Sequence, residues 1–252
     1  MSYSLLIVDT TTVATTTAQP EENKSEDWLT IENNIVVSCA KEATGEIIIP
    51  EGVLGIGDSA FYNCSGITSV IIPDGVNSIG KSAFYYCDHL TSVTIPDSIE
   101  TIADEAFNCC LNLTAIHIPS GLTSIGNTVF AECYNIKEVV IPDGVTSIDN
   151  EALYNCMGLK TLELPDGLES IGNAAFYNCL ELENFIMPDT VTSIDERAFT
   201  DCGKLTEITL PDGITDYKAM AFGNCFDLTI TYKGKTYTSD DLFELEDAIL
   251  GV

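Results

Sequence analysis

Positively charged residues are scarce in this chain. Ten Lys and Arg stand against 39 Asp and Glu among 252 residues, which leaves a formal net charge of -29. A negative charge of this size repels phosphate backbones and the anionic surface of a lipid bilayer. We therefore expect neither a nucleic acid nor a membrane surface as a partner.

Long apolar runs are also lacking. The longest are short pieces such as Leu5–Val8 and Ile47–Ile49, whereas a spanning helix needs about 20 apolar residues, so we expect no membrane insertion. A secretory signal begins with basic residues, but the first cation is Lys24, so we find no intact signal. We expect residues 1–26 to form a flexible tail, and the alternative is the remnant of a signal peptide cleaved near Ala18.

The chain does contain a long internal repeat. Its period is 23 residues, and it runs without an insertion. A fixed period of about 20 to 50 residues is typical of a solenoid. Eight of the nine prolines follow the period: Pro50, Pro73, Pro96, Pro119, Pro142, Pro165, Pro188 and Pro211. Eight of the ten cysteines keep the same spacing: Cys64, Cys87, Cys110, Cys133, Cys156, Cys179, Cys202 and Cys225.

Each repeat has the same order of elements. A short β-branched run such as Val93–Ile95 precedes the proline and predicts a strand. Proline ends that strand because it has no N–H to donate, and a following Pro-Asp-Gly, as at 73–75, is typical of a turn. The next apolar residues are spaced three and four apart, which favours a short helical turn: Ala83, Phe84, Cys87 and Leu90.

A single repeat cannot enclose its apolar side chains, but stacked repeats can. Strands about 4.8 Å apart would form a parallel sheet with a ladder of phenylalanines behind it. We expect an α/β solenoid, curved and right-handed, with the sheet on its concave face. An N-terminal cap would cover 27–49, eight repeats 50–228, and a hairpin and helix cap 229–252, with Ser239 as the N-cap of the helix.

These residues resemble a known family. The pattern Phe84-x-x-Cys87-x-x-Leu90-x-x-Val93-x-Ile95-Pro96-x-x-Ile99-x-x-Ile102 is similar to the 23-residue leucine-rich repeat of the BspA-like bacterial surface proteins, and it recurs over about 45–228. The resemblance implies a leucine-rich repeat solenoid. It also implies a secreted or cell-surface adhesion module without shared catalytic residues, several relatives being implicated in binding host matrix proteins or other microbes.

The cysteines suggest neither disulfides nor a metal site. Side chains on successive rungs point the same way, whereas a disulfide needs converging Cβ atoms, so we expect buried free thiols. Cys109 lies next to the repeat position Cys110 and is expected to face outward or toward the edge, as the most reactive thiol, followed by Cys39. No C-x-x-C pair with zinc-site spacing is present, so we expect no metal.

Candidate catalytic residues are few. The only histidines are His89 and His117, and on a sheet His117 would share a surface with Ser92 and Glu138 from the neighbouring rungs. An open sheet offers no oxyanion hole and does not exclude water, so we expect no enzyme activity and no cofactor. An acidic residue follows most of the repeat prolines, and we attribute it to the preference of Asp for turns. The alternative is that this row of carboxylates binds cations weakly and diffusely.

The outward strand positions are where a function would be encoded, because they vary between repeats while the inward positions do not. They mix aliphatic with polar side chains, which is consistent with a protein contact surface, although β-propensity alone would also explain the aliphatic residues. The candidate binding residues are Ile71, Ser92, Thr94, Ala115, His117, Glu138, Val140, Thr161, Glu163, Asn184 and Ile186.

The resulting hypothesis is a non-enzymatic recognition module that is extracellular or attached to a cell surface. We expect a monomer that binds a protein through the concave face, for example a host matrix protein or another microbial surface protein. The net charge favours a partner with a basic surface. The main alternative is a structural spacer within a larger surface assembly.

Overall fold

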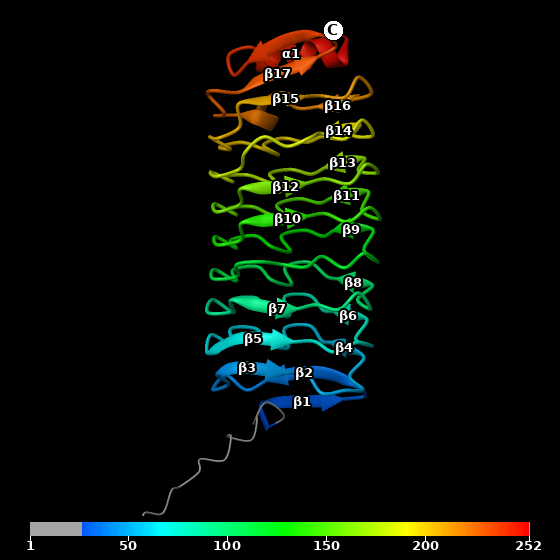
Figure 1. Ribbon diagram of the computed structural model, residues 1–252, viewed down its shortest axis with the longest axis vertical. Coiled ribbons are helices and arrows are strands. Elements are labelled where there is room, and N and C mark those ends of the chain that lie inside the picture. The colour runs from blue at the N-terminus through cyan, green and yellow to red at the C-terminus, as the bar shows by residue number, and fades with distance from the viewer. Residues whose placement is uncertain (1–26, 252) are drawn as a thin grey trace, which may run out of the picture.

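The computed structural model describes residues 27–251, so the tail expected for residues 1–26 lies outside the described residues. The chain winds into a column of stacked rungs, each rung being one 23-residue repeat (Figure 1). A hairpin lies at the N-terminal end of the column and a helix at the C-terminal end. The solenoid of stacked repeats with a parallel sheet, which the sequence predicts, is confirmed.

The first sheet is built from the strands that precede the prolines. Its strands pair in parallel and in register, so equivalent repeat positions such as Val70 and Val93 lie side by side. Side chains alternate: in one strand Glu138 and Val140 are exposed while Val139 is buried. The strands are β3 (Gly45–Ile48), β5 (Ile67–Ile71), β7 (Ser92–Thr94), β10 (Glu138–Val140), β12 (Thr161–Glu163), β15 (Glu207–Thr209) and β17 (Thr229–Tyr232).

A second parallel sheet runs along the other side of the column (Figure 1). The sequence interpretation missed it, because a strand of two residues shows no alternation. Most of its strands are a Ser-Ile pair whose isoleucine is buried. The strands are β4 (Gly55–Ile56), β6 (Ser78–Ile79), β8 (Thr101–Ile102), β9 (Ser124–Ile125), β11 (Ser147–Ile148), β13 (Ser170–Ile171), β14 (Ser193–Ile194) and β16 (Asp216–Tyr217).

The third side, which we call the turn face, corrects the prediction of a short helix in every repeat. Turns occupy these segments, and only the last becomes a short 3₁₀ helix, η2 (Ala219–Phe222). The three-residue spacing reflects isolated turn bonds, such as Cys64 N–H to the Phe61 carbonyl at 3.0 Å. The N–H groups that make no such turn bond donate instead to carbonyls of the next rung. Phe61 N–H donates to the Ala83 carbonyl at 2.7 Å, and Asn63 N–H donates to the Tyr85 carbonyl at 2.8 Å.

A left-handed backbone makes this alternation possible. Two residues in nearly every rung, four positions apart, have φ between 51° and 62°, a region that suits Asn and disfavours most other side chains. Asn63, Asn155, Asn178 and Asn224 occupy the second of these positions. Three of these side chains, those of Asn155, Asn178 and Asn224, also bond between rungs; for example, Asn178 Nδ2 donates to Asn155 Oδ1 at 2.8 Å. The recurrent asparagine therefore serves both conformation and stacking.

The core between the three sides is made of repeated columns. The phenylalanine rings stack, with centroids 4.8 Å apart for Phe61 and Phe84 and 5.1 Å for Phe199 and Phe222. The repeat cysteines are fully buried, and from Cys87 onward each thiol donates to the carbonyl 26 residues earlier at 3.0 to 3.5 Å. Cysteine is small and apolar and carries a weak donor, so it satisfies this position without leaving a cavity.

Hairpins and a helix cover the two ends. Strands β1 (Leu29–Glu32) and β2 (Ile35–Cys39) pair antiparallel, as do β17 and β18 (Lys235–Thr238). The helix α1 begins later than the predicted cap Ser239, since it covers Leu242–Leu250. The Asp241 carboxylate accepts hydrogen bonds from Thr238 N–H at 2.9 Å and Thr238 Oγ1 at 2.8 Å, which closes the chain into a turn before the helix.

The asparagine position makes a stability prediction. Cys109 has φ of 61° at the repeat position that Asn155 occupies in another rung. We expect Cys109→Asn to raise the free energy of unfolding by about 0.5 to 1 kcal/mol, because Asn tolerates this conformation better. The reverse change, Asn155→Cys, should lower it by about 1 kcal/mol through lost side-chain bonds. Urea unfolding of both variants measures this, and a destabilised Cys109→Asn contradicts it.

Candidate binding face

The outward side of the first sheet, which we call the first-sheet face, carries every candidate binding residue. Ten of these side chains are exposed and Ile71 is half-buried. Ile186 stands out most, with 86% of its surface exposed. The face thus presents a continuous set of side chains that have no role in the core: Ile71, Ser92, Thr94, Ala115, His117, Glu138, Val140, Thr161, Glu163, Asn184 and Ile186.

The first sheet is interrupted twice, at 115–118 and at 184–187. Both segments occupy the place of a strand but lack strand pairing, so the sheet divides into three separate pieces. The burial pattern changes in the same way at both places, since Ile116 and Phe185 are only half-buried where other rungs bury the equivalent residue. These interruptions distinguish two rungs of the face from the others.

Side-chain size and hydrogen bonding account for the interruption at 184–187. Phe185 occupies an inward position that Val139, Leu162 and Ile208 fill in other rungs, and its larger ring packs on Phe199 with centroids 5.2 Å apart. The side-chain oxygen of Asn184, rather than a backbone carbonyl of this segment, accepts hydrogen bonds from the next rung. This Oδ1 atom accepts from the N–H groups of Thr206 at 2.9 Å and Glu207 at 3.2 Å.

A second packing change lies beside the interruption at 115–118. Val129 occupies a position that is alanine in the neighbouring rungs, as at Ala106 and Ala152. The Phe107 and Phe130 rings next to it are 5.6 Å apart, wider than the 5.1 Å between Phe84 and Phe107. The second sheet is also broken here, between β8 and β9. The bulkier side chain thus coincides with a wider spacing between two rungs.

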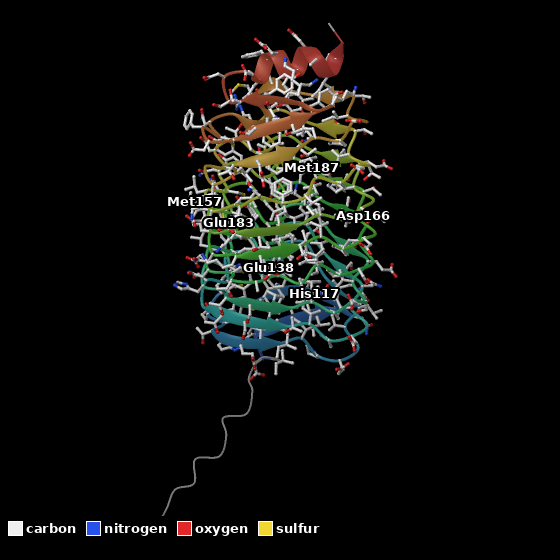
Figure 2. All side chains as sticks on the ribbon, turned by 45° about the horizontal axis from the view of Figure 1, so that its top comes forward. His117, Glu138, Met157, Asp166, Glu183 and Met187 are labelled. Carbon is white, nitrogen blue, oxygen red and sulfur yellow. The ribbon has the colours of Figure 1, made fainter. Side chains whose placement is uncertain are left out.

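A hollow of about 890 Å³ surrounds the first interruption. His117 lies in it, and its Nε2 is 3.1 Å from Oδ1 of Asp97 on the preceding turn. The same carboxylate accepts a bond from Ser120 N–H at 3.4 Å. Figure 2 shows His117 and Glu138 on this part of the molecule. The remaining lining includes Ser92, Val93, Thr94, Ile95, Ala115, Ile116, Ile118, Glu138, Val140 and Pro142.

The second interruption forms a hollow of about 700 Å³. Phe185, Ile186 and Ile208 line its apolar part, and Asp189 and Glu207 contribute carboxylates. As in the first hollow, no lysine or arginine is among the lining residues. Both hollows thus combine aliphatic walls with negative charge, an arrangement suited to a ligand that is cationic and partly apolar.

His117, Ser92 and Glu138 all lie on the first-sheet face, as the sequence predicts, but they do not contact one another through hydrogen bonds. His117 hydrogen-bonds Asp97, and neither Ser92 nor Glu138 is its hydrogen-bond partner within residues 27–251. The hydrogen bond from His117, together with that from Ser120 N–H, holds the pKa of the Asp97 carboxyl below its usual value. The sequence interpretation missed this pair because it compared equivalent strand positions, whereas Asp97 belongs to a turn.

The cysteines are buried and unpaired throughout the described residues, in agreement with the sequence prediction. The expectation for Cys109 is wrong, since only 9% of this residue is exposed. Burial and then the charge of Glu132 raise the pKa of its thiol, which lowers its reactivity. The Cys64 thiol is shifted the other way, because its interaction with the Cys39 thiol and the Lys41 ammonium 4.0 Å away lower its pKa.

The described residues contain neither a metal-binding cluster nor a membrane-spanning helix. Within residues 27–251, no three Asp, Glu, His or Cys side chains converge closely enough to hold a metal ion. The acids that follow the prolines are exposed in single file along the turns, as at Asp74 and Asp143. Over the same part of the chain, no helix has the length and apolar character required to cross a bilayer.

The contact between His117 and Asp97 makes a testable prediction. We expect His117→Ala to raise the pKa of the Asp97 carboxyl toward its ordinary value, because the variant removes the main group that lowers it. A carboxyl-carbon NMR titration measures this. His89→Ala is the control, since His89 lies 3.3 Å from Asp88 and is no partner of Asp97. An unchanged pKa in His117→Ala would rule out the contact.

Comparison with solved structures supports the fold. A leucine-rich repeat protein from Bacteroides ovatus is 26% identical with a TM-score of 0.63, and the match covers 79% of this chain. The chain spans 58% of that protein's length. The T. pallidum leucine-rich repeat protein is 24% identical (TM-score 0.51, 62% of this chain and 88% of that one). A leucine-rich repeat protein from Eubacterium ventriosum is 21% identical (TM-score 0.51, 75% of each chain).

Comparison of the sequence with protein families gives the clearest relationship. Among curated proteins, none matches the chain. The family model described as the BspA type leucine-rich repeat region, with six copies, matches residues 30–160 and 123–246. These two matches together extend over most of the described structure. The chain therefore belongs to the BspA-type leucine-rich repeat family.

Proposed function

We propose that this protein is a non-enzymatic recognition module that binds another protein through the first-sheet face. The observation that carries the proposal is that the inward residues of each strand form the core while its outward residues do not. Inward residues such as Val139 and Leu162 are apolar in every rung and buried in all but the two interrupted ones, while the outward residues vary and most are exposed. An exposed surface that takes no part in the core and mixes aliphatic with polar groups suits a protein partner.

The two hollows strengthen this assignment to one face. They lie on the first sheet, three rungs apart, and they give the face two concave regions. Concave, partly apolar sites with a few polar groups are the usual places for recognition. Membership of a repeat family is consistent with binding, since solenoids present extended surfaces that a partner contacts over several rungs.

The partner we propose is a protein with a basic surface, such as a host matrix protein or another microbial surface protein. The net charge of -29 would attract it and make association slower as salt rises. We place the protein outside the cell or on its surface, and we propose that it acts as a monomer. The competing function is a structural spacer, which would show no saturable binding.

A charge reversal on the face tests the proposal. We expect Val140→Lys combined with Ile186→Lys to reduce binding of a captured partner at least tenfold, because it places cations opposite a basic surface. Both side chains are exposed, so the free energy of unfolding should change by less than about 0.5 kcal/mol. Partners are first isolated from matrix proteins and bacterial surface extracts, and affinities are then measured with purified components.

The matched control uses an equally exposed aliphatic residue elsewhere. Leu54 precedes β4 on the side of the second sheet, and it has the same exposed fraction as Val140, 49%. Leu54→Lys should leave binding unchanged. The proposal is wrong if the double variant binds as well as the parent while Leu54→Lys does not. The absence of any saturable partner would favour the spacer.

A further inference from the structure

The two hollows of the first-sheet face share one plan. In each hollow, a glutamate lies on the rung after the unpaired segment, at the repeat position of that segment's first residue. Glu138 is thus equivalent to Ala115, and Glu207 is equivalent to Asn184. An exposed aliphatic residue lines each hollow as well, Val140 in the first and Ile186 in the second. Each hollow therefore places this glutamate next to an apolar wall, with one aspartate, Asp97 or Asp189, as a second carboxylate.

The distance between the two sites follows from the repeat. Glu138 and Glu207 are three rungs apart, and parallel strands are spaced about 4.8 Å, so the carboxylates are separated by about 14 Å along the column. An extended chain rises about 3.3 to 3.4 Å per residue. Residues four positions apart in such a chain are therefore about 13.5 Å apart, and they point to the same side.

We propose that the two hollows bind two Lys or Arg side chains, four residues apart, of an extended segment of the partner protein that lies along the solenoid axis. This inference rests on the proposed function and specifies the partner. The methylene stems of Lys and Arg would pack on the aliphatic walls, while their charged ends reach Glu138 and Glu207. Such a segment would cross the rungs between the hollows and pass the exposed residues Thr161 and Glu163.

The charges of the face favour this occupant. The outward strand positions carry Glu46, Glu138, Glu163 and Glu207, and no lysine or arginine occupies an outward position of β3 to β15. The nearest cations lie just before the strands. Lys137 and Lys160 line a smaller hollow beside Glu138, but neither is its salt-bridge partner: Lys160 faces Glu183 at 3.3 Å, and Lys204 faces Glu181 at 2.5 Å.

Two peptides of equal composition test the spacing. Both are short, rich in Thr and Ser to favour an extended backbone, and contain two lysines, either four or three positions apart. Three positions place the lysines on opposite sides of an extended chain, so only one hollow is filled. We expect the peptide with the four-residue spacing to bind at least fivefold more tightly in calorimetric titrations. Its affinity should fall as salt rises.

Protein variants assign the binding to the hollows. We expect Glu138→Gln and Glu207→Gln each to weaken the binding of that peptide about fivefold, corresponding to the loss of one exposed ion pair. Glu46→Gln is the matched control, because Glu46 is an exposed glutamate of the same face outside both hollows. It removes the same charge and should change the affinity less than twofold. Thermal unfolding checks that all three variants remain folded.

Three outcomes would overturn the inference. Equal binding of both peptides would show unspecific charge attraction, and equal effects of all three Glu→Gln variants would show the same. The absence of saturable binding up to about 1 mM peptide would exclude the two hollows as a binding site for paired Lys or Arg side chains. In that last case, loss of protein capture by the Val140→Lys and Ile186→Lys double variant would still support the proposed function, so the two failures are distinguishable.

Discussion

The structure depends on the hydrogen bonds between rungs on the turn face. The N–H of each ladder phenylalanine, or of Leu153 in its place, donates to the rung that follows at 2.7 to 2.9 Å, from Phe61 through Phe199. This column of bonds is continuous, whereas the first sheet is broken twice and the second once. The turn face therefore maintains the register of the column where the sheets do not.

The residue types of the repeat follow from that requirement. Backbone bonds to the next rung need left-handed residues on either side of the phenylalanine, which explains asparagine at Asn155 and Asn178. Close stacking needs a small neighbour, as at Ala152 and Ala175, and a compact donor such as Cys156. The outward strand positions take part in none of these contacts. They are consequently free to vary and to carry recognition.

Sequence reasoning reached the architecture because the period, the prolines and the alternating strands are direct consequences of stacking. It predicted the exposed face residue by residue, since alternation within a strand determines which side chains point outward. It failed on the turn face, where turn bonds give Phe61 and Cys64 the spacing of a helix although the bonds between rungs prevent one. Spacing alone does not distinguish these two hydrogen-bond patterns.

The hollows were not predicted, because they arise from departures from the repeat. Phe185 at a position of smaller aliphatic residues was visible in the sequence, and so was Val129 among alanines. Their effect on strand pairing could not be derived, because it depends on how far the backbones of the neighbouring rungs shift to accommodate the larger side chains. Likewise, Cys109 was expected to face outward or toward the edge from its place beside a buried column, but it is buried, and its thiol donates to Oδ1 of Asn108 at 3.2 Å.

Native-state hydrogen exchange tests the central claim most directly, because it measures the protection of each backbone amide. The account predicts that the amides of Phe84, Phe130 and Phe176 exchange only with global unfolding, while those at 116–118 and 185–187 exchange much faster. It also predicts similar protection of the turn-face amides on both sides of each interruption. Slow exchange at 116–118 and 185–187, or fast exchange of the phenylalanine amides, would contradict it.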